Sequence, residues 1–394
     1  MSKFLRIFLI VALAALTVRC GKEEPAPVPG TEQAQPLREK PQLQAAVKAM
    51  AAEAPAVWES LNGIEVWQAG YLPSGAWLNG SAKTARHPMW SVTKTFTGIA
   101  VGIAVQEGKL SLNEKVCDIL KAEADAALAS ALNRNVTDAQ VAHLKAVTVR
   151  DMLTMTCGHT SDPTMAYARR YALSMLPYIT SDGIDVTGAL NSLHLTAPLL
   201  FFAHPFNDAP GTNFTYNTLG SHILSMIVEK KTGEQLRDYL HTRLFKPLGL
   251  DKPAWDEVQG ASAGGWGLHL NTDEMLRFGR LLLQGGAWEG RQLIPSAFLK
   301  DATRLQTRRR EVEEGYQVQG YGFHIWIIPD GYMATGLFGQ YIVVLPTKQA
   351  VIALSSDTPA FTLSQLPEIF ARINSAAQSE AVLKLAWKHL LPAL

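Results

Sequence analysis

The sequence is poor in cysteine, has no excess of charge of either sign, and contains no apolar run long enough to cross a bilayer comfortably. Its 394 residues include 3 cysteines and no C-x-x-C pair, and its 10 histidines are scattered, so neither a disulfide scaffold nor a structural zinc site is expected. Cys117 and Cys157 could form one bridge in an oxidising compartment if they lie close together. Lys plus Arg number 36 against 35 Asp plus Glu. This balance gives no electrostatic basis for binding nucleic acid.

The N-terminus carries the features of an export signal. Two basic residues precede an apolar run from Phe8 to Val18, which has the length of a signal-peptide core. Cys20 and a Pro-, Glu- and Gln-rich stretch follow, an arrangement that resembles a bacterial lipoprotein. We expect a signal peptide at 1–20 and a flexible tether at 21–42, with the protein periplasmic or anchored to the membrane through Cys20. Arg19 departs from the usual small residue, so ordinary cleavage and an uncleaved anchor stay open.

The rest of the chain, residues 43–394, has an ordinary globular composition, with 47% apolar and 18% charged residues overall. Strand-like runs lie near both ends of this region, whereas residues from about 111 to 250 are mainly helical. The economical architecture is an α/β fold, in which residues 43–110 and about 251–394 build a mostly antiparallel sheet flanked by terminal helices. The helical part is inserted between them.

Periodicity and turn residues predict the individual elements. Helices are expected at 43–61, 91–106, 123–132, 149–155, 219–231, 234–244, 272–284 and 366–377. Strands are expected at 64–69, 76–79, 321–328, 332–335, 341–345 and 350–355. Gly108 is expected to end the second helix, and Thr272 to be the N-cap of the helix that it opens.

An S-x-x-K motif opens the helix expected at 91–106. Its three-residue spacing puts the Ser91 hydroxyl and the Lys94 amine on one helix face. Desolvation and the helix dipole both lower the pKa of a lysine buried at a helix N-terminus. Ser91 is therefore the candidate nucleophile and a neutral Lys94 its base, although the same pattern occurs by chance in many chains.

Longer segments resemble one enzyme superfamily. Residues 90–98, and the Q-E-G-K-L-S-L run at 106–112, resemble the nucleophile helix of serine β-lactamases and penicillin-binding proteins, particularly the class C-like esterase and peptidase branch. Residues 147–158 resemble the segment ahead of that family's active-site loop, and residues 210–218 its Y-x-N motif. The resemblance extends from about residue 43 to the C-terminus. It implies a β-lactamase/transpeptidase-like fold with the site between the sheet and the helical part.

The second motif supplies the next candidate. The resemblance makes Tyr216, as a tyrosinate or as a tyrosine that shares its proton with Lys94, a general base in acylation and an acid to the leaving group. Thr218 stands where the motif has asparagine. A hydroxyl cannot offer the two donors of an amide, so positioning of the substrate carbonyl is expected to differ.

The third motif of the family is K-T-G or H-T-G, and residues 334–339 resemble its A-x-G-x-x-G variant. This places Thr335, Gly336 and Leu337 beside the substrate. By the same resemblance the backbone N–H groups of Ser91 and Leu337 would form the oxyanion hole. Ala334 replaces the cation that holds the carboxylate of penicillins, so anionic β-lactams are expected to bind poorly unless another cation substitutes.

Two literal motif matches are interpreted as structural. Lys231-Thr232-Gly233 ends an expected helix, where lysines and a glycine are common. Ser262 lies in a G-x-S-x-G string, but a nucleophile elbow needs a buried strand before it and a helix directly after it. An α/β-hydrolase that uses Ser262 is the rival enzyme hypothesis. Histidines near the motifs are interpreted as packed or solvated side chains: His159, His204 and His324.

The sequence thus predicts a serine hydrolase that forms an acyl-enzyme with a small ester or amide and needs no metal or cofactor. A D-amino-acid peptidase or a β-lactamase of the same fold are the alternatives. From another class, a degenerate envelope binding protein would suit the altered Thr218 and Ala334, but retention of Ser91, Lys94 and Tyr216 argues against it. The acyl group, the leaving group and the oligomeric state are left open.

Overall fold

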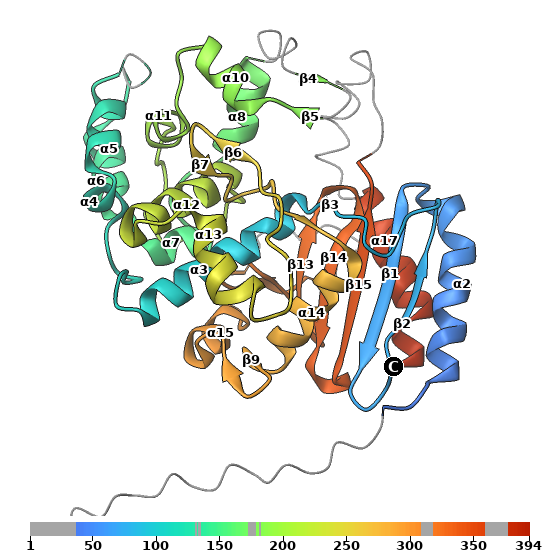
Figure 1. Cartoon of the computed structure of the whole chain (residues 1–394). Coiled ribbons are helices and arrows are strands. Elements are labelled where there is room, and N and C mark those ends of the chain that lie inside the picture. The colour runs from blue at the N-terminus through green and yellow to red at the C-terminus, as the bar shows by residue number, and fades with distance from the viewer. Residues whose placement is uncertain are drawn as a thin grey trace, which may run out of the picture. The chain divides into compact units, whose positions relative to one another are not determined.

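Apolar runs from the two ends of the chain form one sheet. The computed structural model describes residues 37–130, 132, 135–171, 179–180, 183–308, 318–358 and 377–394. The sheet has seven strands in the order β11-β12-β13-β14-β15-β1-β2, all antiparallel (Figure 1). Their bounds are β1 (Leu61–Gln68), β2 (Ser74–Trp77), β11 (Gly320–Tyr321), β12 (Trp326–Ile328), β13 (Gly331–Gly336), β14 (Gln340–Leu345) and β15 (Ala350–Ser356).

Strands β1 and β15 join the two ends of the chain at the middle of the sheet. Ile64 lies opposite Leu354 and Val66 opposite Ile352. Every residue of β15 and nearly every residue of β1 is buried. Burial on both faces explains the apolar run that opens β15, whereas β1 also buries the polar residues Asn62 and Glu65.

Helices cover both faces of the sheet (Figure 1). On one face, α2 (Pro41–Val57) and α17 (Ala377–His389) pack together. The other face carries α14 (Thr272–Leu283). Alternate strand residues enter the two hydrophobic clusters, as the two-residue period requires: Val343 faces the α2 and α17 side, whereas Val344 faces the α14 side.

The α14 side continues into the helical part, through which α3 (Thr93–Gln106) runs. Twelve of its residues are buried, so α3 is a core helix. The surrounding helices are α4 (Val116–Ile119), α5 (Lys121–Leu128), α6 (Asp138–Ala146), α7 (Val149–Leu153), α8 (Pro163–Arg170), α10 (Val186–Ser192), α11 (Ala197–Ala203), α12 (Thr218–Thr232), α13 (Leu236–Leu240) and α15 (Ser296–Ala302). Two-stranded antiparallel pairs complete the described part: β3 (His87–Pro88) with β8 (His269–Leu270), and the hairpins β4 (Ile179–Thr180) with β5 (Gly183–Ile184), β6 (Glu257–Val258) with β7 (Ala261–Ser262), and β9 (Ala287–Trp288) with β10 (Arg291–Gln292).

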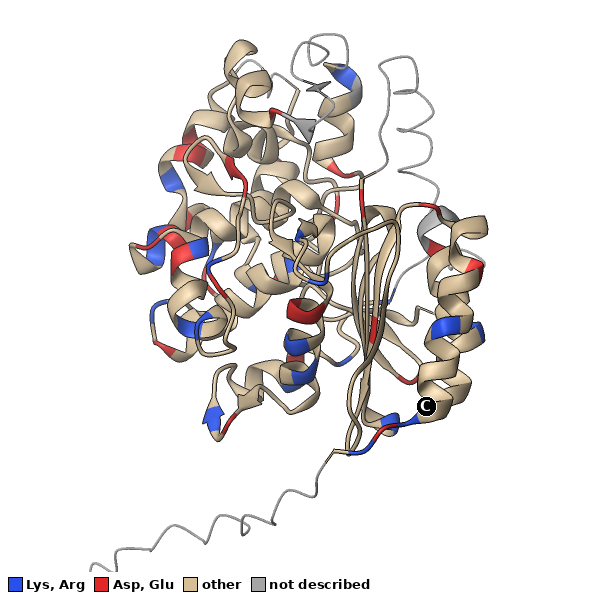
Figure 2. Cartoon of the chain, turned by 45° about the vertical axis from the view of Figure 1, so that its right-hand side comes forward, with Lys and Arg blue, Asp and Glu red and all other residues tan. Residues whose placement is uncertain are grey.

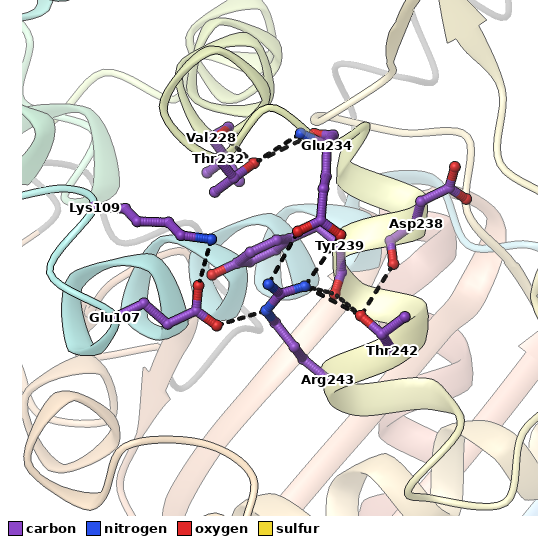
Figure 3. A network of polar contacts seen from close by, with 9 residues as sticks. All are labelled: Glu107, Lys109, Val228, Thr232, Glu234, Asp238, Tyr239, Thr242 and Arg243. Atoms are coloured by element: carbon purple, nitrogen blue, oxygen red, sulfur yellow. Dashed lines mark hydrogen bonds and ion pairs between the residues drawn. The ribbon is translucent and has the colours of Figure 1, made fainter.

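A polar network anchors the C-terminal end of α3 to α13 and the turn that follows it (Figure 3). The Arg243 guanidinium donates to Glu107 at 2.6 Å and to Glu234 at 3.0 Å. It also lies 3.9 Å from the ring centroid of Tyr239. Lys109 pairs with Glu107 at 2.9 Å. The end of α3 farthest from Ser91 is thus held from several directions.

Charged residues are interspersed along the helices, and the strands of the large sheet carry few of either sign (Figure 2). This distribution agrees with the formal net charge of +1. Within the described residues, no single helix has the length and apolar character needed to cross a membrane. In the same described residues, one helix pair, Val186–Ser192 and Ala197–Ala203, reaches that length and composition when the two are taken together, but it is bent by 71°.

The predicted α/β class, with an antiparallel sheet flanked by helices from both ends of the chain, is confirmed. Several predicted element boundaries are wrong. The expected helix 43–61 ends as α2 at Val57, and Leu61 already belongs to β1. The expected helix 91–106 starts with a 3-10 turn, Trp90–Val92, before α3. The expected strand 321–328 is two strands, β11 and β12, separated at His324, whose φ of 53° is left-handed.

The helix caps bring one correction and one confirmation. Asn271, not Thr272, is the N-cap of α14: its side chain accepts from the Glu274 N–H and the Glu274 carboxylate accepts from the Asn271 N–H. The Thr272 hydroxyl instead lies 2.8 Å from the Ser355 hydroxyl. Gly108 does follow α3 with a φ of 68°. The helix expected at 366–377 lies almost wholly outside the described residues, and α17 was not predicted.

Candidate active site

The predicted nucleophile and its predicted base lie within hydrogen-bonding distance. Ser91 is in the 3-10 turn Trp90–Val92, and Lys94 is in the first turn of α3. The Lys94 Nζ is 2.8 Å from the Ser91 Oγ and donates to the Gly265 carbonyl at 2.9 Å. Lys94 is only 1% exposed. The amine is therefore held by two contacts inside the protein.

Burial tunes the Lys94 amine. Desolvation lowers the pKa of Lys94 from 10.5 to about 7, and the Asp162 carboxylate opposes this shift. A neutral amine has two N–H donors and one lone pair, so it can donate to the Gly265 carbonyl while it accepts the Ser91 proton. Asp162 is the N-cap of α8 and accepts from the Thr164 N–H at 2.9 Å. Its own pKa is raised by burial.

Tyr216 joins this pair from the segment that precedes α12. The Lys94 Nζ lies 4.9 Å from the centroid of the Tyr216 ring. Burial raises the pKa of Tyr216 above its ordinary value of 10, and a side-chain hydrogen bond with Ser91 opposes the rise. The phenol is therefore protonated at neutral pH, which suits a hydrogen-bond donor and acid better than a tyrosinate base. The structure thus brings together the three predicted residues Ser91, Lys94 and Tyr216.

The end of strand β13 approaches the nucleophile turn. A Cβ at Gly336 would lie 2.3 Å from the Met89 carbonyl oxygen, so only glycine fits there. Leu337 opens the next 3-10 turn, and Phe338 after it has a φ of 62°. The rings of Phe338 and Trp90 meet edge to face, with centroids 5.3 Å apart. This places the Leu337 segment beside that of Ser91, and the oxyanion role of the two N–H groups stays a prediction.

The remaining predicted substrate residues are Thr335, on β13, and Thr218, at the start of α12. Thr335 pairs with Tyr341 in the sheet and is partly exposed. Thr218 opens α12, and its carbonyl oxygen would lie 2.6 Å from a Cβ at Gly265. Thr218 therefore packs on the loop that holds Lys94. Direct contact of Thr335 or Thr218 with substrate stays a prediction.

Comparison with known proteins identifies the family. A family model described as Beta-lactamase matches residues 62–367. The chain belongs to the beta-lactamase family. It is 28% identical over 309 residues to Penicillin-binding protein 4 of Amycolatopsis lactamdurans, which covers 68% of this chain and 71% of that protein. It is 22% identical over 304 residues to 6-aminohexanoate-dimer hydrolase of Paenarthrobacter ureafaciens, covering 75% and 69%.

Solved structures of beta-lactamase-like hydrolases share the fold. EstCE1, described as a hydrolase with promiscuous acyltransferase activity, aligns with a TM-score of 0.60 at 16% identity over 84% of this chain and 98% of that one. A D-stereospecific amidohydrolase from Streptomyces sp. aligns with a TM-score of 0.54 at 20% identity over 81% and 94%. The predicted membership of the β-lactamase and penicillin-binding protein superfamily is confirmed, and the chain is a serine hydrolase of this family.

In this beta-lactamase-family hydrolase the two literal motif matches lie apart from the site chemistry. Gly233 caps the C-terminus of α12 with a φ of 76°, and Lys231 pairs with Glu114 at 2.5 Å. Ser262 is 1% exposed and belongs to the short hairpin β6–β7. Its Oγ accepts from the Arg237 N–H at 3.3 Å. No helix follows Ser262 directly, so the α/β-hydrolase hypothesis is wrong.

The two described cysteines are both free thiols and form no bridge with each other. Burial raises the pKa of Cys157 to about 11, which makes it a poor nucleophile. Its Sγ lies 3.4 Å from the Asn217 Nδ2 in the packing beneath Tyr216. Across the part of the chain that the structure describes, no group of three or more His, Cys, Asp or Glu residues could hold a metal ion.

Three contributors to the site were not singled out from the sequence. The Gly265 carbonyl holds Lys94, the Asp162 carboxylate acts on the Lys94 pKa, and the Asn217 side chain caps α12 directly after Tyr216. A backbone carbonyl carries no side-chain signal. Asp162 before Pro163 has the pattern of an N-cap, which gives no hint of a partner in α3.

Proposed function

We propose that the protein hydrolyses a small, uncharged ester or amide through an acyl-enzyme on Ser91. The contact between the buried Lys94 amine and the Ser91 hydroxyl, at 2.8 Å, is the observation that carries this proposal. Ser91 Oγ forms a bond to the substrate carbonyl carbon while its proton passes to Lys94. The N–H groups of Ser91 and Leu337 would stabilise the oxyanion.

The second half of the reaction restores the enzyme. Collapse of the tetrahedral intermediate breaks the bond to the leaving group, which takes a proton from Lys94 or Tyr216. Water then attacks the acyl-enzyme, the amine accepts its proton, and the acid leaves as Ser91 regains its hydrogen. No redox partner is needed, because the acyl carbon only exchanges a bond to oxygen or nitrogen for another bond to oxygen, and its oxidation state does not change.

The side chains near Ser91 support an uncharged, apolar substrate. Trp90 and Phe338 form one aromatic pair, and Tyr216 stacks parallel to Trp326 at 5.8 Å and 11° to form another. All four side chains are partly exposed. Ala334, where relatives hold an anion with a cation, cannot pair with a carboxylate. Aromatic walls without that cation favour an aryl or alkyl ester over a penicillin.

Covalent labelling tests the nucleophile. The purified protein is treated with a fluorophosphonate probe, and the modified peptide is identified by mass. We expect labelling of Ser91, abolished in Ser91→Ala and retained in Ser262→Ala, a buried serine that serves as the matched control. An unlabelled protein would favour the degenerate binding protein instead.

A substrate panel then separates the enzyme classes. Phenyl and alkyl esters, an aryl amide, a D-alanyl-D-alanine peptide and benzylpenicillin are compared by kcat/KM. We expect the neutral esters to exceed benzylpenicillin by about 100-fold, the scale of one lost charge-assisted contact of about 3 kcal/mol. A reversed order would assign a β-lactamase or a peptidase.

We also propose that the chain is exported, with Cys20 as the lipid attachment point. The apolar run ending near Cys20 and the Pro-rich stretch behind it support this. Mass spectrometry of the mature N-terminal peptide, from protein produced in a bacterial host, tests the lipid attachment. A diacylglyceryl cysteine is expected, and a plain cleaved terminus would reject the lipid anchor while leaving export intact.

A further inference from the structure

A buried histidine touches the main chain of the predicted base. His324 lies between β11 and β12 and is 1% exposed. Its Nδ1 is 3.0 Å from the Lys94 carbonyl oxygen. Because a carbonyl can only accept, we assign the imidazole proton to Nδ1, which leaves Nε2 as an acceptor.

The other side of the ring faces the Tyr216 segment. His324 Nε2 lies 3.4 Å from the Ser221 hydroxyl, which in turn lies 3.2 Å from the Asn217 carbonyl oxygen. The single hydroxyl proton is shared between these two acceptors. A chain of contacts therefore runs from the Lys94 carbonyl through His324 and Ser221 to Asn217, the residue directly after Tyr216.

The main chain of His324 is held as firmly as its ring. Its carbonyl accepts from the Thr95 hydroxyl at 2.8 Å, and its N–H donates to the Leu153 carbonyl at 3.0 Å. Gly98 lies one turn beyond Lys94, and a Cβ there would stand 3.2 Å from the His324 Cβ. Since a larger residue would crowd the ring, Gly98 leaves the histidine room beside the Lys94 carbonyl.

Charge explains why a histidine can occupy this place. Burial lowers the pKa of His324 to about 3; the hydrogen bond to the Lys94 carbonyl opposes this shift, and the Lys94 charge adds to it. The ring therefore stays neutral at working pH and fixes the backbone without competing with the amine for protons. An additional cation here would have lowered the pKa of Lys94 further.

We propose that His324 is a positioning residue for acylation, which fixes the Lys94 main chain relative to the Tyr216 segment so that both side chains meet at Ser91. This inference rests on the proposed acyl-enzyme function. Because His324 belongs to the sheet hairpin, Lys94 to α3 and Asn217 to α12, one ring links the three parts that build the site. Displacements of about 1 Å in such a site can cost about 100-fold in rate.

Four variants of the full chain separate positioning from folding. His324→Ala removes both ring contacts. His324→Asn keeps an N–H donor near the Nδ1 position, and asparagine tolerates the left-handed backbone. Ser221→Ala removes only the hydroxyl that connects the His324 ring to the Asn217 carbonyl. Ser225→Ala is the matched control, because this buried α12 serine donates to the Ser262 carbonyl at 2.7 Å and, among the described residues, has no hydrogen bond to Lys94, His324 or the Tyr216 segment.

The readouts are the maximal rate and half-saturating concentration of fluorophosphonate labelling at Ser91, and kcat and KM for a phenyl ester. We expect His324→Ala to lower both maximal rates about 100-fold with KM changed less than about twofold. His324→Asn should recover at least about tenfold of that loss. Ser221→Ala should fall about three- to tenfold, while Ser225→Ala should match the parent protein.

Each contrary result has one meaning. Parent-like maximal rates in His324→Ala, or no recovery in His324→Asn, would overturn the positioning role. If His324→Ala does not fold, as judged by circular dichroism, equal rates in Ser221→Ala and Ser225→Ala overturn it instead. A parent protein that is not labelled at Ser91 overturns the proposed function and this inference together, whereas labelling without sensitivity to His324 overturns the inference alone.

Discussion

At the scale of single residues, the site depends on a lysine that loses its proton near neutrality. In water the Lys94 amine would be protonated at neutral pH. Burial among α3, the Gly265 loop and Tyr216 removes the solvation of the charged form and so lowers its pKa. A carboxylate at Asp162 moderates the effect. The balance of these two influences sets the pH range in which Ser91 can be activated.

The pH dependence of kcat/KM follows from this balance. The base must be neutral and its pKa is about 7, so kcat/KM for a phenyl ester should fall about tenfold per pH unit below that value. Above it the rate should level off, because the pKa of Tyr216 lies above its ordinary value. Stopped assays from pH 5 to 9 measure the profile, and a constant rate between pH 5 and 8 would contradict a lysine base.

Asp162→Asn tests the electrostatic half of the balance. Asparagine is as good an N-cap as aspartate, so α8 should keep its cap while the charge is lost. Without a carboxylate to favour the ammonium, the pKa of Lys94 should drop and the acidic limb of kcat/KM should move to lower pH. A limb that stays in place, with the parent melting temperature retained, would show that Asp162 does not act on Lys94.

At the scale of secondary-structure elements, features set by local sequence signals could be predicted, whereas features set by contacts distant in sequence could not. Helix α12 follows from its apolar spacing, terminal lysines and Gly233, which are all local signals. The break at His324 does not, because its left-handed backbone is held by Thr95, Leu153 and Lys94, all distant in sequence. Ser91 and Lys94 were found through their spacing, whereas the Gly265 carbonyl required the fold.

The cap of α14 gives a prediction for this scale. Asn271→Ala removes the side chain that accepts from the Glu274 N–H, and the free energy of unfolding should fall by about 1 kcal/mol. Urea denaturation followed by circular dichroism measures it. Asn113→Ala, an exposed asparagine in a turn, is the control and should change nothing. An equal loss in both variants would contradict the capping role.

At the scale of the whole molecule, the sheet needs both helices on its outer face. Leu383 of α17 is 3% exposed and packs in the cluster shared with α2 and the strands. Leu383→Ala should lower the free energy of unfolding by about 2–5 kcal/mol, since it leaves a cavity in that cluster. Leu72→Ala, at 42% exposure, should have little effect. Urea midpoints measure both, and kcat of the folded variants should equal that of the parent.

The pairing of β1 with β15 governs when the enzyme becomes active during its synthesis. Leu61 can meet its partner Ser356 only after all the residues between them have left the ribosome. Contacts this distant in sequence make folding slow. The nascent chain therefore lacks its central sheet until β15 has been synthesised, and β13 packs beside the Ser91 turn only after the sheet has formed. Such late closure keeps the hydrolase inactive until the segment that carries β15 has been synthesised.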